Sequence, residues 1–158
     1  MVYALLKTVH MLAVIGWLGG MFFVLFCLRP ALPVLDAPQR VRLMHAALLR
    51  FLNFAFGASL LTLFTGLWMI GRVAKANVQA GGSFTLSIEL WLMVVLGTLM
   101  VAIVGHVRFA LFGRLRRAVA AESWPQAAAA LDSIRRWVGV NFALGVFIVV
   151  AVMVGGSL

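Results

Sequence analysis

The chain has 158 residues, of which 65% are hydrophobic and only 11% are charged, and its formal net charge is +9. Soluble domains average about 45–50% apolar and about 25% charged residues, so this composition excludes an ordinary soluble domain and indicates an integral membrane protein. A basic chain that binds nucleic acid should carry its charge on a soluble face with base-stacking or phosphate-binding elements. No such pattern is present, and we expect the lipid bilayer, not nucleic acid, as the main partner.

Four segments are long and apolar enough to be transmembrane helices. In the first, residues 8–28, the only ionisable side chains are His10 and Cys27, and residues 51–71, 90–107 and 137–158 contain no Asp, Glu, Lys or Arg. A helix of about 20 apolar residues crosses a bilayer core of about 30 Å, whereas the apolar part of a cleaved signal peptide has only about 7–15 residues. The sequence predicts one all-α integral membrane domain, residues 1–158. It is a four-transmembrane-helix bundle with helices at about 3–28, 40–70, 84–120 and 126–156.

The basic residues predict how the helices are oriented. Ten of the 13 lie in or next to the first and third connections, and the other three are Lys7, Arg72 and Lys75. The ten are Arg29, Arg40, Arg42, Arg50, Arg108, Arg114, Arg116, Arg117, Arg135 and Arg136. Cytoplasmic loops of membrane proteins are enriched in Lys and Arg, so we expect a bacterial inner-membrane protein with both termini periplasmic. The single cysteine excludes a disulfide framework within the chain.

Short sequence motifs predict where two helices begin and where one helix contacts another. Asp36 before Pro38 predicts a helix cap, and Ser123 with Pro125 predicts another. Gly16 and Gly20 form a G-x-x-x-G pair, which allows another helix to approach closely. The partner is either a helix of the same bundle or a second copy of the chain, and we expect a homodimer.

His10 is the first residue that needs a functional explanation. An ionisable side chain inside a transmembrane helix is by default a candidate for a functional site, and His10 lies about 10 Å from the outer end of the first helix. A purely structural histidine, bonded to a backbone carbonyl or to Glu89, is the alternative.

The other two histidines form a predicted inner pair. His45 and His106 lie near the inner ends of the second and third helices, at a common depth that suits bis-imidazole ligation of a haem iron. Arg50, Asn53 and Gly57 share one helix face, and Arg50 is placed to pair with a haem propionate or a quinone oxygen. The alternative is that His45 and the arginines reach out to lipid headgroups.

Methionines suggest a different metal. Five of the eight belong to the outer half of the bundle: Met1, Met11, Met69, Met93 and Met153. Thioether and imidazole groups are ligands that suit Cu(I), so His10, Met11, Met69, Met93 and Met153 are a candidate copper site. Methionine also fills irregular gaps in apolar interiors. No nucleophile triad or phosphate loop is present, so no enzyme class is favoured, and Glu89 is the one acidic side chain placed for a proton relay.

Three stretches resemble a known family. The stretch K-T-V-H-M-L-A-V-I-G-W-L-G-G (residues 7–20) is similar to the first helix of the CopD (copper-resistance protein D) domain and of the related HemJ-type protoporphyrinogen oxidases. Arg50-Phe51 followed by L-F-T-G-L (residues 63–67) resembles the families' second helix, and G-H-V-R-F-A-L-F-G-R-L-R-R (residues 105–117) resembles the HemJ-type stretch with a histidine before G-R-L.

The resemblance implies that His10 is the central functional residue, with Arg50 and His106 as candidates for a buried site. CopD implies copper uptake or tolerance, whereas HemJ implies a haem b protein that oxidises a porphyrinogen. Both families usually have a lysine early in the third helix, where this chain has Glu89 and Trp91, and such a cation would help to hold an anionic substrate.

We therefore predict a membrane protein that handles copper in its periplasmic half. The alternative is a haem b redox protein that oxidises a quinol or a porphyrinogen, with His10, His45 or His106 as axial ligands. A third class is a structural subunit without a cofactor. Expected partners are a quinone or a periplasmic copper protein.

Overall fold

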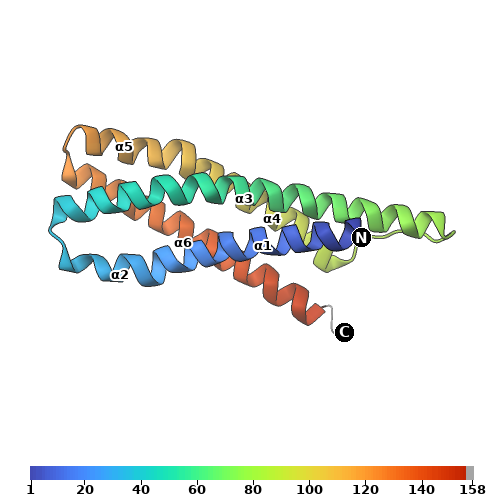
Figure 1. The fold of residues 1–158 in the computed structure, drawn as a ribbon. Coiled ribbons are helices and arrows are strands. Elements are labelled where there is room, and N and C mark those ends of the chain that lie inside the picture. The colour runs from blue at the N-terminus through green and yellow to red at the C-terminus, as the bar shows by residue number, and fades with distance from the viewer. Residues whose placement is uncertain (156–158) are drawn as a thin grey trace.

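The computed structural model describes residues 1–155, and every long element in that range is a helix. Four helical spans are long and apolar enough to cross a membrane: Val2–Val34, Ala37–Gln79, Ile88–Ala120 and Trp124–Gly155. They run antiparallel along one bundle (Figure 1). The predicted all-α fold with four transmembrane helices is confirmed.

Two of the spans are built from several helical pieces. The first contains α1 (Val2–Phe22), the π-helical segment η1 (Phe23–Leu28), α2 (Arg29–Ala31) and the 3₁₀ turn η2 (Leu32–Val34). The third contains α4 (Ile88–His106), the π-helical segment η3 (Val107–Leu111) and α5 (Phe112–Ala120). The second and fourth spans are the single helices α3 (Ala37–Gln79) and α6 (Trp124–Gly155).

The first span continues past its predicted end at residue 28, although Pro30 follows. A proline inside a helix has no N–H and its ring clashes with the carbonyl four residues earlier. The wider π-helical turns of η1 end at Leu28, two residues before Pro30, and Pro30 occupies the first turn of α2, where a free N–H is not needed. The chain therefore stays helical to Val34.

Helix α3 is longer than the sequence predicts. Asp36 Oδ1 accepts a hydrogen bond from the backbone N–H of Gln39 at 2.8 Å, which confirms the predicted cap. At the other end, the charges from Arg72 onward suggest a boundary, but residues 72–79 include no Gly or Pro, and the helix ends only before Gly81, which has a φ of +79°. With 43 residues the helix is about 65 Å long, so it projects beyond the other spans (Figure 1).

The remaining boundaries agree with the prediction to within a few residues. Helix α4 begins at Ile88 rather than at about 84, and the hydroxyl of Ser87 caps it. Helix α6 begins at Trp124, so Pro125 lies in its first turn as predicted. Its predicted end at residue 156 lies outside the described residues.

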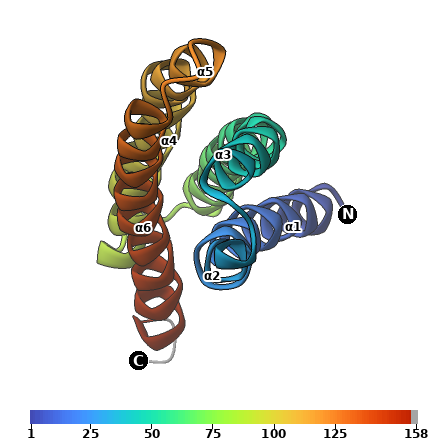
Figure 2. The same cartoon turned by 90° about the vertical axis from the view of Figure 1, so that its left-hand side faces the viewer.

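The spans pack as two pairs. Helix α1 packs mainly on α3, and α4 with α5 packs mainly on α6, as the end view shows (Figure 2). The interior is mostly apolar, and the outer surface is also apolar, with Leu12, Phe64 and Met153 each more than 60% exposed. An apolar exterior of this kind is what lipid-facing helices require.

The glycine pair of the first helix serves the contact between α1 and α3. A Cβ atom on Gly16 would lie 2.8 Å from Phe54 Cζ, and one on Gly20 would lie 2.5 Å from Phe51 Cε2. Of the two interpretations of G-x-x-x-G, the structure supports packing within the chain. The expected homodimer stays a prediction.

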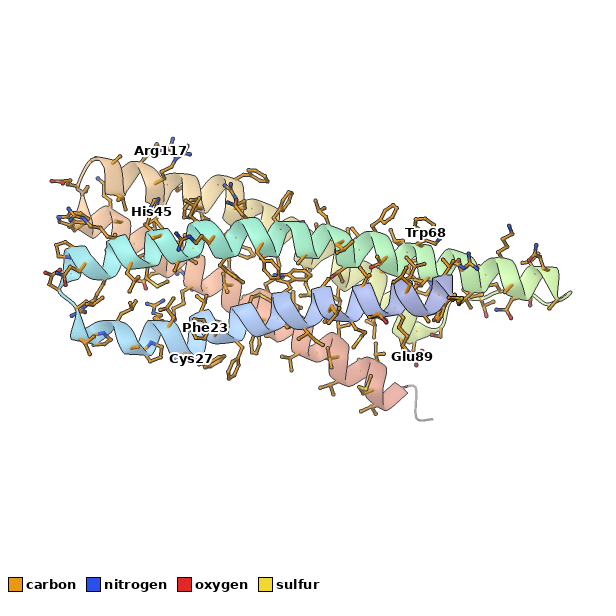
Figure 3. The ribbon with its side chains drawn as sticks, viewed as in Figure 1. Phe23, Cys27, His45, Trp68, Glu89 and Arg117 are labelled. Atoms are coloured by element: carbon orange, nitrogen blue, oxygen red, sulfur yellow. The ribbon has the colours of Figure 1, made fainter. Side chains whose placement is uncertain are left out.

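The two ends of the bundle differ in charge. The α2–α3 and α5–α6 connections lie at the same end, to which His45 and Arg117 are also close, whereas Trp68 and Glu89 lie toward the other end (Figure 3). At the end that holds these two connections, ion pairs link Arg29 of α2 to Asp132 of α6 (2.8 Å) and Arg42 of α3 to Glu122 of the α5–α6 connection (3.7 Å). This is the end that carries most of the arginines, and its cytoplasmic location stays a prediction.

Candidate functional site

His10 is buried between α1 and α3. Its side chain is 8% exposed, and its Nδ1 lies 3.0 Å from the hydroxyl oxygen of Thr65 on α3. Glu89 is not a partner, because its side chain packs beside Gly155 at the end of α6. The partner shown is therefore the Thr65 hydroxyl, and the suggested Glu89 partner is wrong.

The hydrogen bonds of Thr65 assign the protonation state of His10. A hydroxyl has one hydrogen, and Thr65 lies 2.7 Å from the carbonyl oxygen of Leu61, to which it donates. The Thr65 oxygen then accepts from His10, so Nδ1 carries the imidazole proton. The other nitrogen, Nε2, keeps its lone pair, and it makes no side-chain hydrogen bond within residues 1–155. A histidine that is oriented through one nitrogen and free at the other is the usual form of a metal-binding imidazole.

Gly66 makes room for the imidazole. A Cβ atom on Gly66 would lie 3.2 Å from His10 Cε1 and 3.6 Å from Nδ1. The pair Thr65-Gly66 therefore gives α3 both the hydrogen-bond acceptor for the ring and the space in which the ring lies.

The predicted methionine ligands are spread over the outer half and differ in burial. Met11 and Met153 are 44% and 65% exposed, on the outside of the bundle, whereas Met69 and Met93 are half-buried. Met69 follows Thr65 by four residues and therefore lies on the same face of α3. Of the four, Met69 has the position that best suits a shared site with His10.

His45 and His106 do not form the predicted pair. The half-buried ring of His45 stacks on Phe112, with ring centroids 5.2 Å apart, and its buried Nε2 has no hydrogen-bond partner among residues 1–155. His106 is exposed and its ring lies against Trp137. Because Gly105 packs against Phe56, His106 is level with that part of α3, about 16 Å from His45 along the helix. The prediction placed His45 and His106 at one depth because each lies near the end of a run without charged residues. In the structure these runs end at different heights along the bundle.

Arg50 is exposed, so its predicted place in a buried site is wrong. Arg50, Asn53 and Gly57 do share one face of α3, but this face points outward. Asn53 accepts a hydrogen bond at 2.7 Å from Arg108 Nε, and the Arg108 guanidinium lies 5.5 Å from the Phe109 ring centroid. The sequence signal for this contact is that Asn53 is an isolated amide in an apolar run.

Two cavities lie elsewhere in the bundle. The larger has a volume of about 400 Å³ and lies between the α2 region and α6. Its polar lining residues are Arg29, Arg40, Asp132 and Arg135, and the rest of its lining is mostly apolar. The smaller has about 10 Å³ and lies between Trp17, Met21 and Asn141. Residues 1–155 contain no cluster of three or more His, Cys, Asp or Glu side chains placed to hold a metal ion.

Comparison with known proteins connects this arrangement to a family. The family model described as Copper resistance protein D matches residues 45–154, from α3 nearly to the end of α6. No curated protein and no solved structure matches the chain. Thr65 and Gly66 lie inside the matched segment and His10 lies before it. The family match and the four membrane-spanning helices together establish that this chain is a multi-pass membrane protein of the CopD (copper resistance protein D) family.

Proposed function

We propose that this protein binds Cu(I) at His10 Nε2, in the outer half of the bundle, as part of copper uptake or tolerance across the bacterial inner membrane. The observation that carries the proposal is the state of His10. It is buried in an apolar bundle, held through Nδ1 by Thr65, and makes no side-chain hydrogen bond through Nε2 within residues 1–155.

Copper is the metal that fits this environment. The outer half of the bundle supplies imidazole nitrogen from His10 and thioether sulfur from its methionines, and soft thioethers favour Cu(I) over hard cations. We assign Met69 as the most suitable second ligand, because Thr65 and Met69 are one turn apart on α3. Met11, Met93 and Met153 are additional thioethers at the outer end, where copper would enter.

The charge distribution supports an outer location for this site. Ten basic residues lie toward the opposite end of the bundle, and such an end is normally cytoplasmic. His10 then faces the periplasmic half, with both termini periplasmic. A periplasmic copper protein is the partner that we expect to deliver the ion, and we propose that the protein acts as a homodimer.

Copper titration of the purified protein tests the proposal. We expect the wild-type protein to withdraw Cu(I) from a chromogenic competing ligand and His10→Ala to bind one equivalent fewer. His106→Ala is the matched control, since His106 is exposed and has no hydrogen-bond partner among the described side chains. It should bind as much copper as the wild type.

Two results would contradict the proposal. The first is equal Cu(I) binding by the wild type and His10→Ala. The second is a purified wild-type protein that is red, with a Soret band lost on His10→Ala, because His10 would then be a haem ligand.

A further inference from the structure

The larger cavity lies where the first span and α6 separate. Toward the end of the bundle that holds the α2–α3 and α5–α6 connections (the arginine-rich end), α2 lies away from the start of α6 in both views (Figures 1 and 2). The cavity of about 400 Å³ occupies this space, and α3 forms its third wall. Its volume falls within the range of about 300–1,000 Å³ that is typical of small-molecule sites.

The charged residues that line this cavity leave an excess of positive charge. Arg29 Nη2 lies 2.8 Å from Asp132 Oδ1, so these two side chains neutralise each other. Arg40 donates to two backbone carbonyls just before α3, which hold its guanidinium but bring no negative charge. Arg135 makes no hydrogen bond or ion pair with any of residues 1–155. Arg40 and Arg135 are therefore cations without a counter-ion in the described part of the chain.

Apolar side chains line the part of the cavity that lies deeper in the bundle. Each wall contributes one of them: Val24 on the first span, Leu48 on α3 and Val138 on α6. Along the helix axes, Leu48 is about 12 Å deeper than Arg40, and Val138 is about 5 Å deeper than Arg135. Cations near the end of the bundle and hydrocarbon further in are complementary to an amphiphile with an anionic head.

The general enrichment of arginine at this end does not account for the cavity. Arg114, Arg116, Arg117 and Arg136 belong to the same end and do not line it. A guanidinium binds phosphate oxygens through paired hydrogen bonds as well as charge, and basic pockets between transmembrane helices bind anionic lipid headgroups. A free phosphate ion would use the cations but leave the apolar part unfilled, so a phospholipid fits the whole cavity better.

We propose that this cavity binds one anionic phospholipid, with its phosphate at Arg40 and Arg135 and an acyl chain against Leu48 and Val138. The proposal does not depend on the proposed copper function, because His10 does not line the cavity. A lipid bound there contacts the first span, α3 and α6 at once. Since it binds only the folded bundle, it should raise the melting temperature of the protein.

Lipid titration of the delipidated protein in detergent tests the proposal, with bound lipid counted by native mass spectrometry. The probes are phosphatidylglycerol, phosphatidylcholine with the same acyl chains, and inorganic phosphate. We expect one molecule of phosphatidylglycerol to bind more tightly than phosphatidylcholine and to raise the melting temperature. Inorganic phosphate at the same concentration should leave the melting temperature unchanged.

Charge variants test the headgroup contact. Arg135→Gln and Arg40→Gln should each weaken phosphatidylglycerol binding about fivefold, the effect of one arginine near an anionic headgroup, and should leave phosphatidylcholine binding unchanged. Arg117→Gln is the matched control, because Arg117 is an exposed arginine at the same end that does not line the cavity. It should bind both lipids as the wild type does.

A large side chain in the cavity tests the contact with the acyl chain. Ala128 lines the cavity and is exposed, so Ala128→Trp fills the space without displacing a buried side chain. This variant should lose the bound phosphatidylglycerol. Ala129→Trp is the control, since Ala129 is an exposed neighbour on α6 that does not line the cavity.

Three results would each overturn the proposal. The first is phosphatidylglycerol binding by Arg135→Gln and Ala128→Trp that is as tight as in their controls. The second is equal binding of phosphatidylcholine and phosphatidylglycerol by the wild type, and the third is equal stabilisation by inorganic phosphate. None of these results bears on Cu(I) binding at His10, so the two proposals can fail separately.

Discussion

At the scale of single residues, the contact between His10 and Thr65 determines what the histidine can do. The sequence singled out His10, because an ionisable group in an apolar run is rare, but it did not reveal the partner. Thr65 is an inconspicuous hydroxyl in a long apolar helix, and such hydroxyls usually bond to their own helix, as Thr65 also does. Only the packing of α1 on α3 shows that its oxygen also accepts from the imidazole.

Replacing Thr65 should weaken copper binding without removing any proposed ligand. Thr65→Val keeps the shape of the side chain and removes the acceptor for His10 Nδ1–H. Loss of such a supporting hydrogen bond typically lowers metal affinity about 10- to 100-fold, and we expect a rise of that size in the Cu(I) Kd from competition titration. The tautomer with the proton on Nε2 becomes accessible, and it cannot bind a metal through that nitrogen.

Thr98 provides the control for this substitution. It is exposed, and its hydroxyl donates within α4 to the carbonyl of Val94 at 2.7 Å. Thr98→Val should leave the Cu(I) Kd unchanged. Equal affinities for Thr65→Val and the wild type would mean that Thr65 does not orient the ligand.

At the scale of elements, the close approach of α1 to α3 positions His10 against Thr65. Gly16 and Gly20 allow this approach, because the rings of Phe54 and Phe51 occupy the space where side chains would be. The spacing of the two glycines was visible in the sequence, but the identity of the partner helix was not. Both a second chain and a neighbouring helix satisfy the same motif.

A single methyl group tests this contact. Gly20→Ala would place its Cβ against the Phe51 ring, and overpacking of this kind costs about 1–3 kcal/mol. We expect a lower unfolding midpoint in detergent. Gly19→Ala is the control on the same helix, since a Cβ there meets nothing within 4 Å, and its midpoint should not fall. A stable Gly20→Ala protein beside a destabilised Gly19→Ala protein would contradict the packing of α1 on α3.

The helix boundaries show where sequence reasoning succeeds and where it stops. The cap residue Asp36 and the first-turn proline Pro125 predicted two helix starts correctly, because a cap acts through a local hydrogen bond and a proline through its fixed backbone angle. The end of α3 was misplaced because charge was used as the boundary, although a charged residue such as Arg72 continues a helix once it leaves the lipid. The π-helical segments η1 and η3 have no local signature of comparable strength.

At the scale of the whole molecule, the number of membrane spans could be predicted from the sequence. Which face of each helix points into the bundle could not. Apolar length alone determines the four spans. Which residues face inward depends on a contrast between two helix faces, and in this chain both faces are apolar. The positions of Arg50, His45 and His106 were therefore misjudged, although all three lie on predicted helices.

The orientation in the membrane is a separate prediction. A cysteine introduced at Gly82, in a Cys27→Ser background that removes the native exposed thiol, should react with a membrane-impermeant maleimide added to intact spheroplasts. A cysteine at Arg117 should react only after the membrane is opened. The reverse pattern would place the termini in the cytoplasm and His10 in the inner half.

The central claim is that copper binds to the imidazole of His10, and X-ray absorption of the Cu(I)-loaded protein tests it most directly. We predict a nitrogen ligand with imidazole multiple scattering, together with sulfur scattering from methionine. His10→Ala should lose the imidazole signal, and His106→Ala should keep it. An imidazole signal that persists in His10→Ala, or that disappears in His106→Ala, would show that copper binds elsewhere in the bundle.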